Sequence, residues 1–447
     1  MKSFLISPPV QEEIDQQANA RQTTPTPIPV IITLNESKTD PAAGVEPSRA
    51  RVKEILDSHK IPFRESQFYV FASLTPDVIY ELGNEKDSVY QIWKDEKCTT
   101  HILSSADTIK ASACWRTFEA RGKGITWGIL DTGIRSDHPH FQQFNTIDQQ
   151  LSRNFSNSQS LEDSNGHGTH VAGIVAGARC APTPPAPIKA AIQIESQLGN
   201  SVIELSGYPS GMAPLAKLVN LKVLDDDGSG SASNCILALE YVRKLNTTGR
   251  SIRIDGINMS LGYPFDPRWY GCGKSPLCQE VTRTVNSGCM VVISCGNSGY
   301  GVTRLNTGEE VPTWIALSIT DPANTESAIA VGSTHKAQPH AYGVSYFSSK
   351  GPTGDGRMKP DLVAPGEKVI SCSIELDQYE YEERSGTSMA APHVSGAIAA
   401  FLSAHMEYRG DPYKVKEIFL KTATDLGRAP NFQGAGFVDL MRAIMSV

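Results

Sequence analysis

The segment Gly386–Pro392 constrains this chain more than any other, because it places a serine at the start of a helix. Apolar residues recur after it at the three- and four-residue spacing of a buried helical face: Val394, Ala397, Ile398, Phe401 and Leu402. The first N–H groups of a helix have no internal partner and lie at the positive end of its dipole. Ser388 is therefore expected where an oxyanion would meet hydrogen-bond donors. A serine that only caps the helix is the alternative. Pro392 is expected in the first turn, where its missing N–H is tolerated.

Two further segments supply the groups that a serine nucleophile needs. Residues 124–133 predict a short apolar strand that ends in Asp131, and functional groups gather at the carboxyl ends of strands in open α/β sheets. Residues 165–173 place His167 between two glycines at the head of a second apolar helix. An alcohol needs an adjacent base, and that base needs a third group to hold its tautomer. Asp131, His167 and Ser388 can fill these three roles.

A fourth segment, residues 291–299, predicts a strand that breaks into a Gly-Asn-Ser-Gly turn. Together with residues 256–262 and 347–352, these segments resemble the subtilisin-like serine peptidases, or subtilases. The resemblance implies a serine endopeptidase with a three-layer α/β domain and a mainly parallel central sheet. It also implies that Asn297 is an oxyanion donor together with the Ser388 backbone N–H. An asparagine in a turn is common for structural reasons alone.

The resemblance further implies where a polypeptide substrate binds. One edge would pair with the substrate backbone as an added strand, and a second edge would lie opposite it. A third segment would complete the walls of the pocket for the residue before the scissile bond. These implied substrate-binding residues are Gly228, Ser229 and Gly230, then Ser260, Leu261 and Gly262, then Ser294, Cys295 and Gly296. The aspartates at 225–227 are interpreted as a solvated acidic turn.

The N-terminal quarter of the chain, residues 1–105, has a different pattern. Residues 1–27 are polar and predict a disordered arm. Residues 28–105 predict strand, helix, strand, helix, strand, which is typical of a small α+β, ferredoxin-like domain. This layout resembles the inhibitory propeptide domain of subtilases, so that the chain would be made as a self-inhibited zymogen. A docking domain of the same fold is the alternative. Residues 106–447 form the predicted peptidase domain.

The composition of the chain argues against nucleic-acid binding, a signal peptide and a membrane span. The 447 residues carry a net charge of −7, so the basic surface that nucleic acids require is not expected. The apolar run near Met1 is too short for a signal peptide, and no stretch has the length of a membrane span. A cytoplasmic monomer is expected, with export by a non-standard route left open. The 9 cysteines are interpreted as free thiols in a reducing compartment.

No metal ligand set is predicted. His138 and His140 follow the Asp131 strand without a nucleophile motif, and His170 lacks the glutamate of a zinc motif, so all three are interpreted as structural. In secreted subtilases a calcium loop commonly occupies the region that corresponds to residues 180–210. Here that region is rich in proline and predicts a hairpin around residues 199–200, which leaves a structural calcium ion in doubt.

Residues 263–276 are a second departure from the family pattern, either a lid or a surface loop. The alternative to an active peptidase is a catalytically silent subtilase fold that binds peptides or regulates another protein. The presence of all four chemical residues, Asp131, His167, Asn297 and Ser388, favours the enzyme.

Overall fold

The computed structural model describes residues 4–19, 25–37, 43–95, 104–181, 186–193, 200–247, 252–266, 268, 271–304 and 308–447. Contacts between residues divide the chain into two compact units, 1–100 and 101–447. The predicted boundary between residues 105 and 106 is therefore slightly late. Residues 104–108 belong to the larger unit, where the Thr108 hydroxyl donates a hydrogen bond to the Lys336 carbonyl at 2.7 Å. The intervening residues 96–103 lie outside the described residues.

The smaller unit is an antiparallel sheet with helices on one face. Its strands follow the order β2-β3-β1-β4. Alternate residues of β1, such as Val30 and Ile32, are buried beneath the helices with Val52, Leu56 and Leu82. The strands are β1 (Ile28–Leu34), β2 (Phe63–Glu65), β3 (Tyr69–Leu74) and β4 (Val89–Lys94), and the helices are α1 (Pro8–Asn19), α2 (Glu46–Ser58) and α3 (Pro76–Leu82).

The prediction of a disordered arm over residues 1–27 is wrong for residues 4–19. Ile6, Val10 and Ile14 are buried in the core of the smaller unit, and most of this segment is the helix α1. The Ser7 N–H also donates to the Ile92 carbonyl of β4 at 3.0 Å. Apolar residues four positions apart lie on one face of a helix, so three of them are enough to bury it. The many glutamines around these three apolar residues made their helical spacing hard to recognise in the sequence.

The larger unit contains a parallel sheet with the strand order β15-β14-β11-β10-β5-β9-β6. The central strands are buried throughout, as expected for a parallel sheet covered on both faces. The strands are β5 (Thr126–Asp131), β6 (Arg153–Asn154), β9 (Lys217–Lys222), β10 (Gly256–Met259), β11 (Met290–Ser294), β14 (Ile329–His335) and β15 (Leu362–Glu367).

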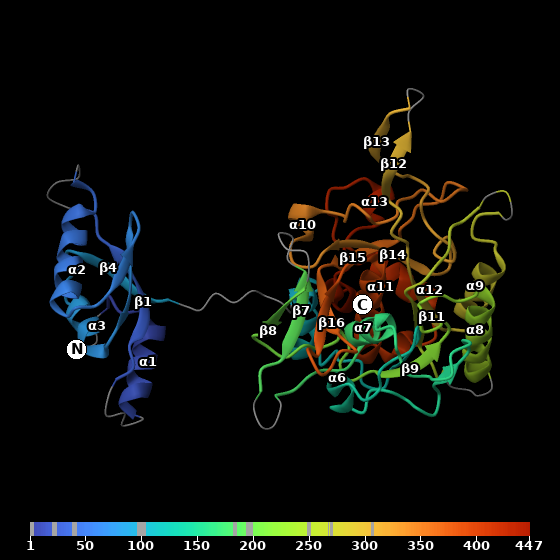
Figure 1. Cartoon of the computed structure of the whole chain (residues 1–447), viewed down its shortest axis with the longest axis horizontal. Helices are drawn as coiled ribbons and strands as arrows, with labels where there is room; N and C mark the ends of the chain where they lie inside the picture. Colours follow the sequence, from blue (N-terminus) through green and yellow to red (C-terminus); the bar gives the residue numbers. More distant parts are fainter. Residues whose placement is uncertain are drawn as a thin grey trace. The chain divides into compact units, whose positions relative to one another are not determined.

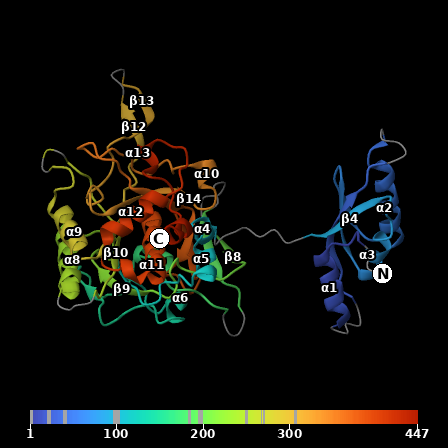
Figure 2. The same cartoon turned by 180° about the vertical axis from the view of Figure 1, so that it is seen from behind.

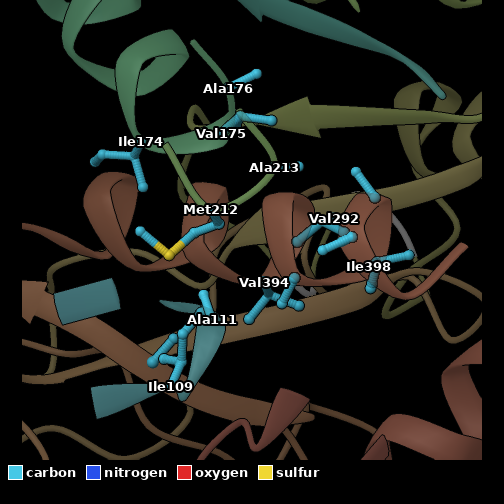
Figure 3. Close-up of a cluster of buried hydrophobic side chains, with 14 of the residues drawn as sticks. Ile109, Ala111, Ile174, Val175, Ala176, Met212, Ala213, Val292, Val394 and Ile398 are labelled. Carbon is cyan, nitrogen blue, oxygen red and sulfur yellow. The ribbon is translucent and has the colours of Figure 1, made fainter. Parts of the chain in front are cut away.

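Helices cover both faces of this sheet, which gives three layers. The helices α7 (His167–Val175) and α11 (Thr387–Ala404) pack on one face. The helices α8 (Ala232–Thr247) and α9 (Pro276–Asn286) pack on the other and lie side by side in both views (Figure 1, Figure 2). Figure 3 shows part of the hydrophobic core that includes α7 and α11, in which Ile109 and Ala111 join Val394 and Ile398 of α11. The predicted three-layer α/β domain is confirmed.

The remaining elements of the larger unit lie outside its main sheet. The predicted hairpin forms from β7 (Lys189–Gln193) and β8 (Asn200–Glu204), and it joins β16 (Val369–Cys372) and β17 (Tyr381–Arg384) in a second sheet. Strands β12 (Tyr300–Arg304) and β13 (Glu310–Trp314) form a projecting hairpin that the sequence analysis did not predict (Figure 1). The short helices are α4 (Ser104–Thr108), α5 (Ala111–Thr117), α6 (Pro139–Gln142), α10 (Pro339–Tyr342), η2 (Met406–Tyr408), α12 (Pro412–Thr422), α13 (Pro430–Gln433) and α14 (Leu440–Met445). None of the described helices is both long enough and apolar enough to cross a membrane.

Candidate active site

Three element ends bring the predicted catalytic side chains to one edge of the sheet. Asp131 is the last residue of β5, His167 is the first residue of α7, and Ser388 is the second residue of α11. Gly166 precedes α7 with a φ of 92°, a conformation that favours glycine. A Cβ on Gly168 would lie only 2.2 Å from the Gly133 carbonyl oxygen, so α7 can approach the end of β5 only with a glycine there.

Asp131 and His167 form a close pair. The imidazole Nδ1 lies 2.7 Å from Asp131 Oδ1, which also accepts a hydrogen bond from the Thr132 N–H at 2.8 Å. With Nδ1 as the donor to the carboxylate, Nε2 is left as the proton acceptor. Burial by itself lowers the pKa of His167, but the charge and hydrogen bond of Asp131 more than offset this and raise that pKa above its usual value of 6.5. The pair therefore stabilises an imidazolium.

Asp163 holds the backbone around this pair, and sequence reasoning missed it. Its buried carboxylate accepts hydrogen bonds from the Thr132 hydroxyl at 2.9 Å and from the Gly166 N–H at 2.9 Å. It also accepts from the N–H and hydroxyl of Thr169 at 2.9 and 2.6 Å. One carboxylate thus connects the residue after Asp131 to the turn before His167. An acidic residue shortly before an Asn-Gly turn was the available signal.

The Ser388 hydroxyl points toward Ser260, the residue that follows β10. Its Oγ donates to the Ser260 carbonyl at 3.2 Å, and within the described part of the chain no hydrogen bond joins it to His167. The Ser260 hydroxyl donates in return to the Ser388 carbonyl at 2.8 Å. That carbonyl needs an outside donor because Pro392, four residues later in α11, has no N–H to offer it. Pro392 was expected to be tolerated without a replacement for its missing N–H. In the structure, the Ser260 hydroxyl makes the hydrogen bond to the Ser388 carbonyl that Pro392 cannot donate.

Asn297 lies beside the start of α11 with its side-chain amide oriented. Its Oδ1 accepts hydrogen bonds from the N–H and the hydroxyl of Thr387, both at 2.9 Å. An ideal Cβ built on Gly386 would lie 3.4 Å from Asn297 Nδ2 and 3.7 Å from the Ser388 backbone nitrogen. Both nitrogens therefore approach one point next to Ser388. The absence of a side chain at Gly386 leaves that point free for a ligand atom.

A cavity of about 480 Å³ adjoins His167. Two of the predicted substrate edges, Gly228–Gly230 and Ser260–Gly262, line it. Residues that the sequence analysis did not assign complete its lining: Thr132, Asn165, Leu224, Ser231, Ala232, Cys235, Tyr263, Leu277 and Arg384. These come from separate loops, from helices α8 and α9 and from strand β17, so no local motif marks them. Tyr263 opens the predicted lid segment, of which residues 267 and 269–270 lie outside the described residues.

The third predicted segment lies outside the lining of this cavity. Ser294 is buried at the end of β11, and Cys295 directs its thiol toward the Ser348 hydroxyl at 3.7 Å. A Cβ on Gly296 would lie 2.8 Å from Ser349 Oγ, so this glycine packs against the 345–350 loop. Burial raises the pKa of the Cys295 thiol to about 12. A thiol of that kind is unreactive at neutral pH.

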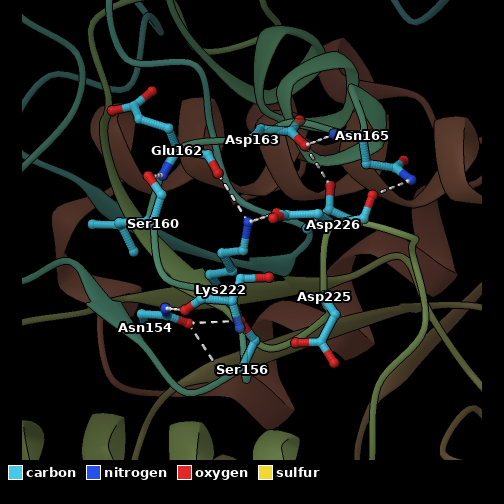
Figure 4. Close-up of polar contacts among 12 residues, drawn as sticks. Asn154, Ser156, Ser160, Glu162, Asp163, Asn165, Lys222, Asp225 and Asp226 are labelled. Carbon is cyan, nitrogen blue, oxygen red and sulfur yellow. Dashed lines mark hydrogen bonds and ion pairs between the residues drawn. The ribbon is translucent and has the colours of Figure 1, made fainter.

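A buried lysine ties the substrate edge to the loop before His167 (Figure 4). Lys222 Nζ donates to the Glu162 carbonyl at 2.9 Å and pairs with the Asp226 carboxylate at 2.6 Å. The Asn165 amide reaches the Asp226 carbonyl at 3.4 Å. Asp225 accepts from the Asn157 N–H at 2.7 Å, and Asp227 accepts from the Ser229 hydroxyl at 2.7 Å. The carboxylates of the acidic turn at 225–227 thus form hydrogen bonds and an ion pair that fix the position of the substrate edge at 228–230.

Within the described residues, no group of three or more His, Cys, Asp and Glu side chains could hold a metal ion. The region of the family's calcium loop is instead the β7–β8 hairpin, in which Ala190 pairs with Tyr381 of β17. Because backbone pairing holds this hairpin without an ion, we propose that EDTA changes the melting temperature of the protein by less than about 1 °C. Differential scanning fluorimetry with and without EDTA measures this. A fall of several degrees that calcium restores would contradict it.

Residues 122–437 match the Subtilase family. The chain is 28% identical over 412 residues to serine protease AprX of Bacillus subtilis (strain 168), with 88% of this chain and 83% of that protein covered. It is 30% identical over 359 residues to an intracellular serine protease of Paenibacillus polymyxa, with 78% and 89% covered. It is 31% identical over 341 residues to the major intracellular serine protease of Bacillus subtilis (strain 168), with 74% and 86% covered. The chain therefore belongs to the subtilase family and is a subtilisin-like serine peptidase.

Proposed function

We propose that this protein is a serine endopeptidase in which Asp131, His167 and Ser388 act as a catalytic triad. The 2.7 Å pair between Asp131 and His167, next to the Ser388 end of α11 and the cavity, carries this proposal. Ser388 Oγ attacks the peptide carbonyl while His167 Nε2 takes its proton, and His167 then returns the proton to the leaving nitrogen. Asp131 keeps Nδ1 as a donor and stabilises the imidazolium. The Ser388 hydroxyl must first leave the Ser260 carbonyl.

The oxyanion would be bound by Asn297 Nδ2 and the Ser388 backbone N–H. Both nitrogens approach the free point beside Gly386, and Thr387 fixes the orientation of the Asn297 amide. Donors that are already oriented stabilise the developing charge without reorganisation.

A fluorophosphonate probe tests the proposed chemistry. An active peptidase is expected to be labelled at Ser388, as located by peptide mass analysis, and to cleave an unfolded protein substrate. Folded protein that is neither labelled nor active would support the alternative, a silent subtilase fold that binds peptides.

Replacing Asp131 by asparagine tests the pairing. His167 must be neutral to accept a proton, so activity is present above its pKa and is lost as the pH falls through it. Because that pKa is raised, the wild-type acid limb of kcat/KM is expected above pH 6.5. Without the carboxylate, burial lowers the pKa, so the acid limb moves to lower pH while kcat falls about 10⁴-fold. Profiles from pH 5 to 9 measure both changes. The exposed Asp137→Asn is the control, and an unmoved acid limb in Asp131→Asn contradicts the assignment.

Replacing Asn297 by alanine removes one proposed oxyanion donor. We expect kcat to fall about 10²- to 10³-fold with little change in KM, the size of loss known for this residue's counterpart in subtilisin. Steady-state kinetics on a short peptide measure the two constants. Ser298→Ala, at the exposed neighbouring position, is the matched control. A loss confined to KM would instead mean that Asn297 binds the ground state.

We also propose that the smaller unit is the inhibitor of the peptidase. The sheet face opposite its helices carries Phe71, Ile31 and Trp93 as direct cross-strand neighbours, and Trp93 is 43% exposed. An apolar sheet face open to solvent is typical of a docking surface. The isolated segment is expected to inhibit the processed peptidase, whereas a docking domain for another partner would leave activity unchanged.

We propose a monomer in the same compartment as the intracellular relatives. Two of the relatives are named as intracellular serine proteases, which supports this location.

A further inference from the structure

The cavity beside His167 contains one basic side chain. Among the described residues that line it, Arg384 is the single lysine or arginine, and no aspartate or glutamate is present. The carboxylates of the acidic turn nearby are not part of the lining, and the one of Asp226 pairs with Lys222. A bound polypeptide would therefore meet one guanidinium, whose charge Glu382 balances in part.

Arg384 lies directly against the turn that carries His167. It ends β17, four residues before Ser388, and its Nη2 would lie 2.9 Å from a Cβ on Gly166. Its charge acts on the imidazole, since it tends to lower the pKa of His167. The guanidinium thus stands within a few ångströms of the residue that would protonate the leaving nitrogen.

The guanidinium keeps donors for a ligand. Nη2 donates to Glu382 Oε1 at 2.9 Å, and within the described part of the chain Nε and Nη1 have no hydrogen-bond partner. Burial raises the pKa of the Glu382 carboxyl, which weakens its hold on the arginine as the pH falls. The other carboxylates near His167 are engaged, since Asp131 pairs with the imidazole and Asp163 accepts from Thr132, Gly166 and Thr169. A planar guanidinium with free N–H groups fits a carboxylate.

We infer that Arg384 selects polypeptide substrates with aspartate or glutamate at the residue that follows the scissile bond. This inference rests on the proposed function. The two substrate edges, residues 228–230 and 260–262, are expected to hold the residues before the bond, and Arg384 belongs to neither edge. It stands on the strand that leads into Ser388, beside the base that serves the leaving group. The residue nearest to it is therefore the one released with the new amino terminus.

Quenched fluorescent peptides that differ only by glutamate or glutamine at one position test this assignment. With glutamate directly after the scissile bond, wild type is expected to show about tenfold higher kcat/KM than with glutamine, and the preference should shrink as ionic strength rises. In Arg384→Gln the ratio should fall to near one. In Arg384→Glu the ratio should fall below one, in favour of glutamine. Arg179→Gln, which removes an arginine paired with Glu380 outside the cavity lining, is the matched control and should keep the wild-type ratio.

The outcomes separate this assignment from the proposed function. Active wild type with no preference for glutamate, or an unchanged ratio in Arg384→Gln, overturns the role of Arg384 and leaves the triad standing. A preference that also disappears in Arg179→Gln overturns it as well, because general charge would then explain the effect. Folded wild type that cleaves no peptide and is not labelled by a fluorophosphonate overturns the proposed function and this assignment together.

Discussion

Ser388→Ala is expected to lower kcat by about 10⁶-fold, the loss known for the corresponding change in subtilisin, a member of the same family. The methyl group cannot form an acyl-enzyme, and it removes the hydroxyl that donates to the Ser260 carbonyl. Peptide binding should change little, since the edges at 228–230 and 260–262 remain. Steady-state kinetics and fluorophosphonate labelling measure the loss. Ser385→Ala, at an exposed serine three residues earlier, is the matched control.

The same pair of proteins tests self-processing. Intact mass is expected to show that wild type loses about the first hundred residues, close to the division between the two units, while Ser388→Ala remains whole. Ser385→Ala should be processed like wild type. If wild type and Ser388→Ala both remain whole while wild type cleaves added peptides, the enzyme works without removal of its smaller unit. If both are shortened equally, another protease makes the cut.

The positions of the proposed catalytic residues could be predicted because each belongs to a short local motif at the end of an element. The carboxyl end of β5 and the starts of α7 and α11 meet at one edge because the sheet is parallel. A motif in sequence therefore implies a position in space. The same reasoning found the oriented turn of Asn297, since it follows β11 directly.

The rest of the cavity lining, beyond residues 228–230 and 260–262, could not be predicted in the same way. Leu277 and Cys235 come from α9 and α8, and Arg384 comes from a strand outside the main sheet, so only tertiary packing brings them together. Cys295, which the resemblance implied to be a substrate-binding residue, lies two residues before Asn297. It is fully buried and directs its side chain to the 345–350 loop.

Buried histidines are the basis of the second large effect. His138 and His140, which were interpreted as structural, and His393, which the sequence analysis did not consider, are buried, and each donates one ring N–H to a backbone carbonyl. Burial lowers the pKa of His138 and of His393 to about 4 and that of His140 to about 3. His170 is also buried, and burial holds its pKa well below the usual value. Sequence alone could show that these residues lacked catalytic partners but not that they were neutral.

These pKa values predict that the folded larger unit is sensitive to acid. The unfolded chain binds protons at each histidine as the pH falls below 6.5, whereas the folded chain does not until about pH 4. The stability from the neutral histidines is complete above pH 6.5 and is lost between pH 6.5 and 4. Over this range, each histidine lowers the free energy of unfolding by about 1.4 kcal/mol for each unit by which the pH falls. Three of them therefore remove roughly 10 kcal/mol by pH 4, which is comparable to the whole stability of a domain.

Urea unfolding between pH 4.5 and 7 measures this loss, because the slope of the unfolding free energy against pH counts the protons taken up on unfolding. His393→Leu should reduce the slope by about one proton, since His393 Nε2 has no partner among the described residues and its Nδ1 only supplements a helix carbonyl. The exposed His59→Gln in the smaller unit should leave the slope for the larger unit unchanged. A slope that His393→Leu does not alter would mean that this histidine is already protonated in the folded protein at these pH values, and that the acid sensitivity arises from other groups.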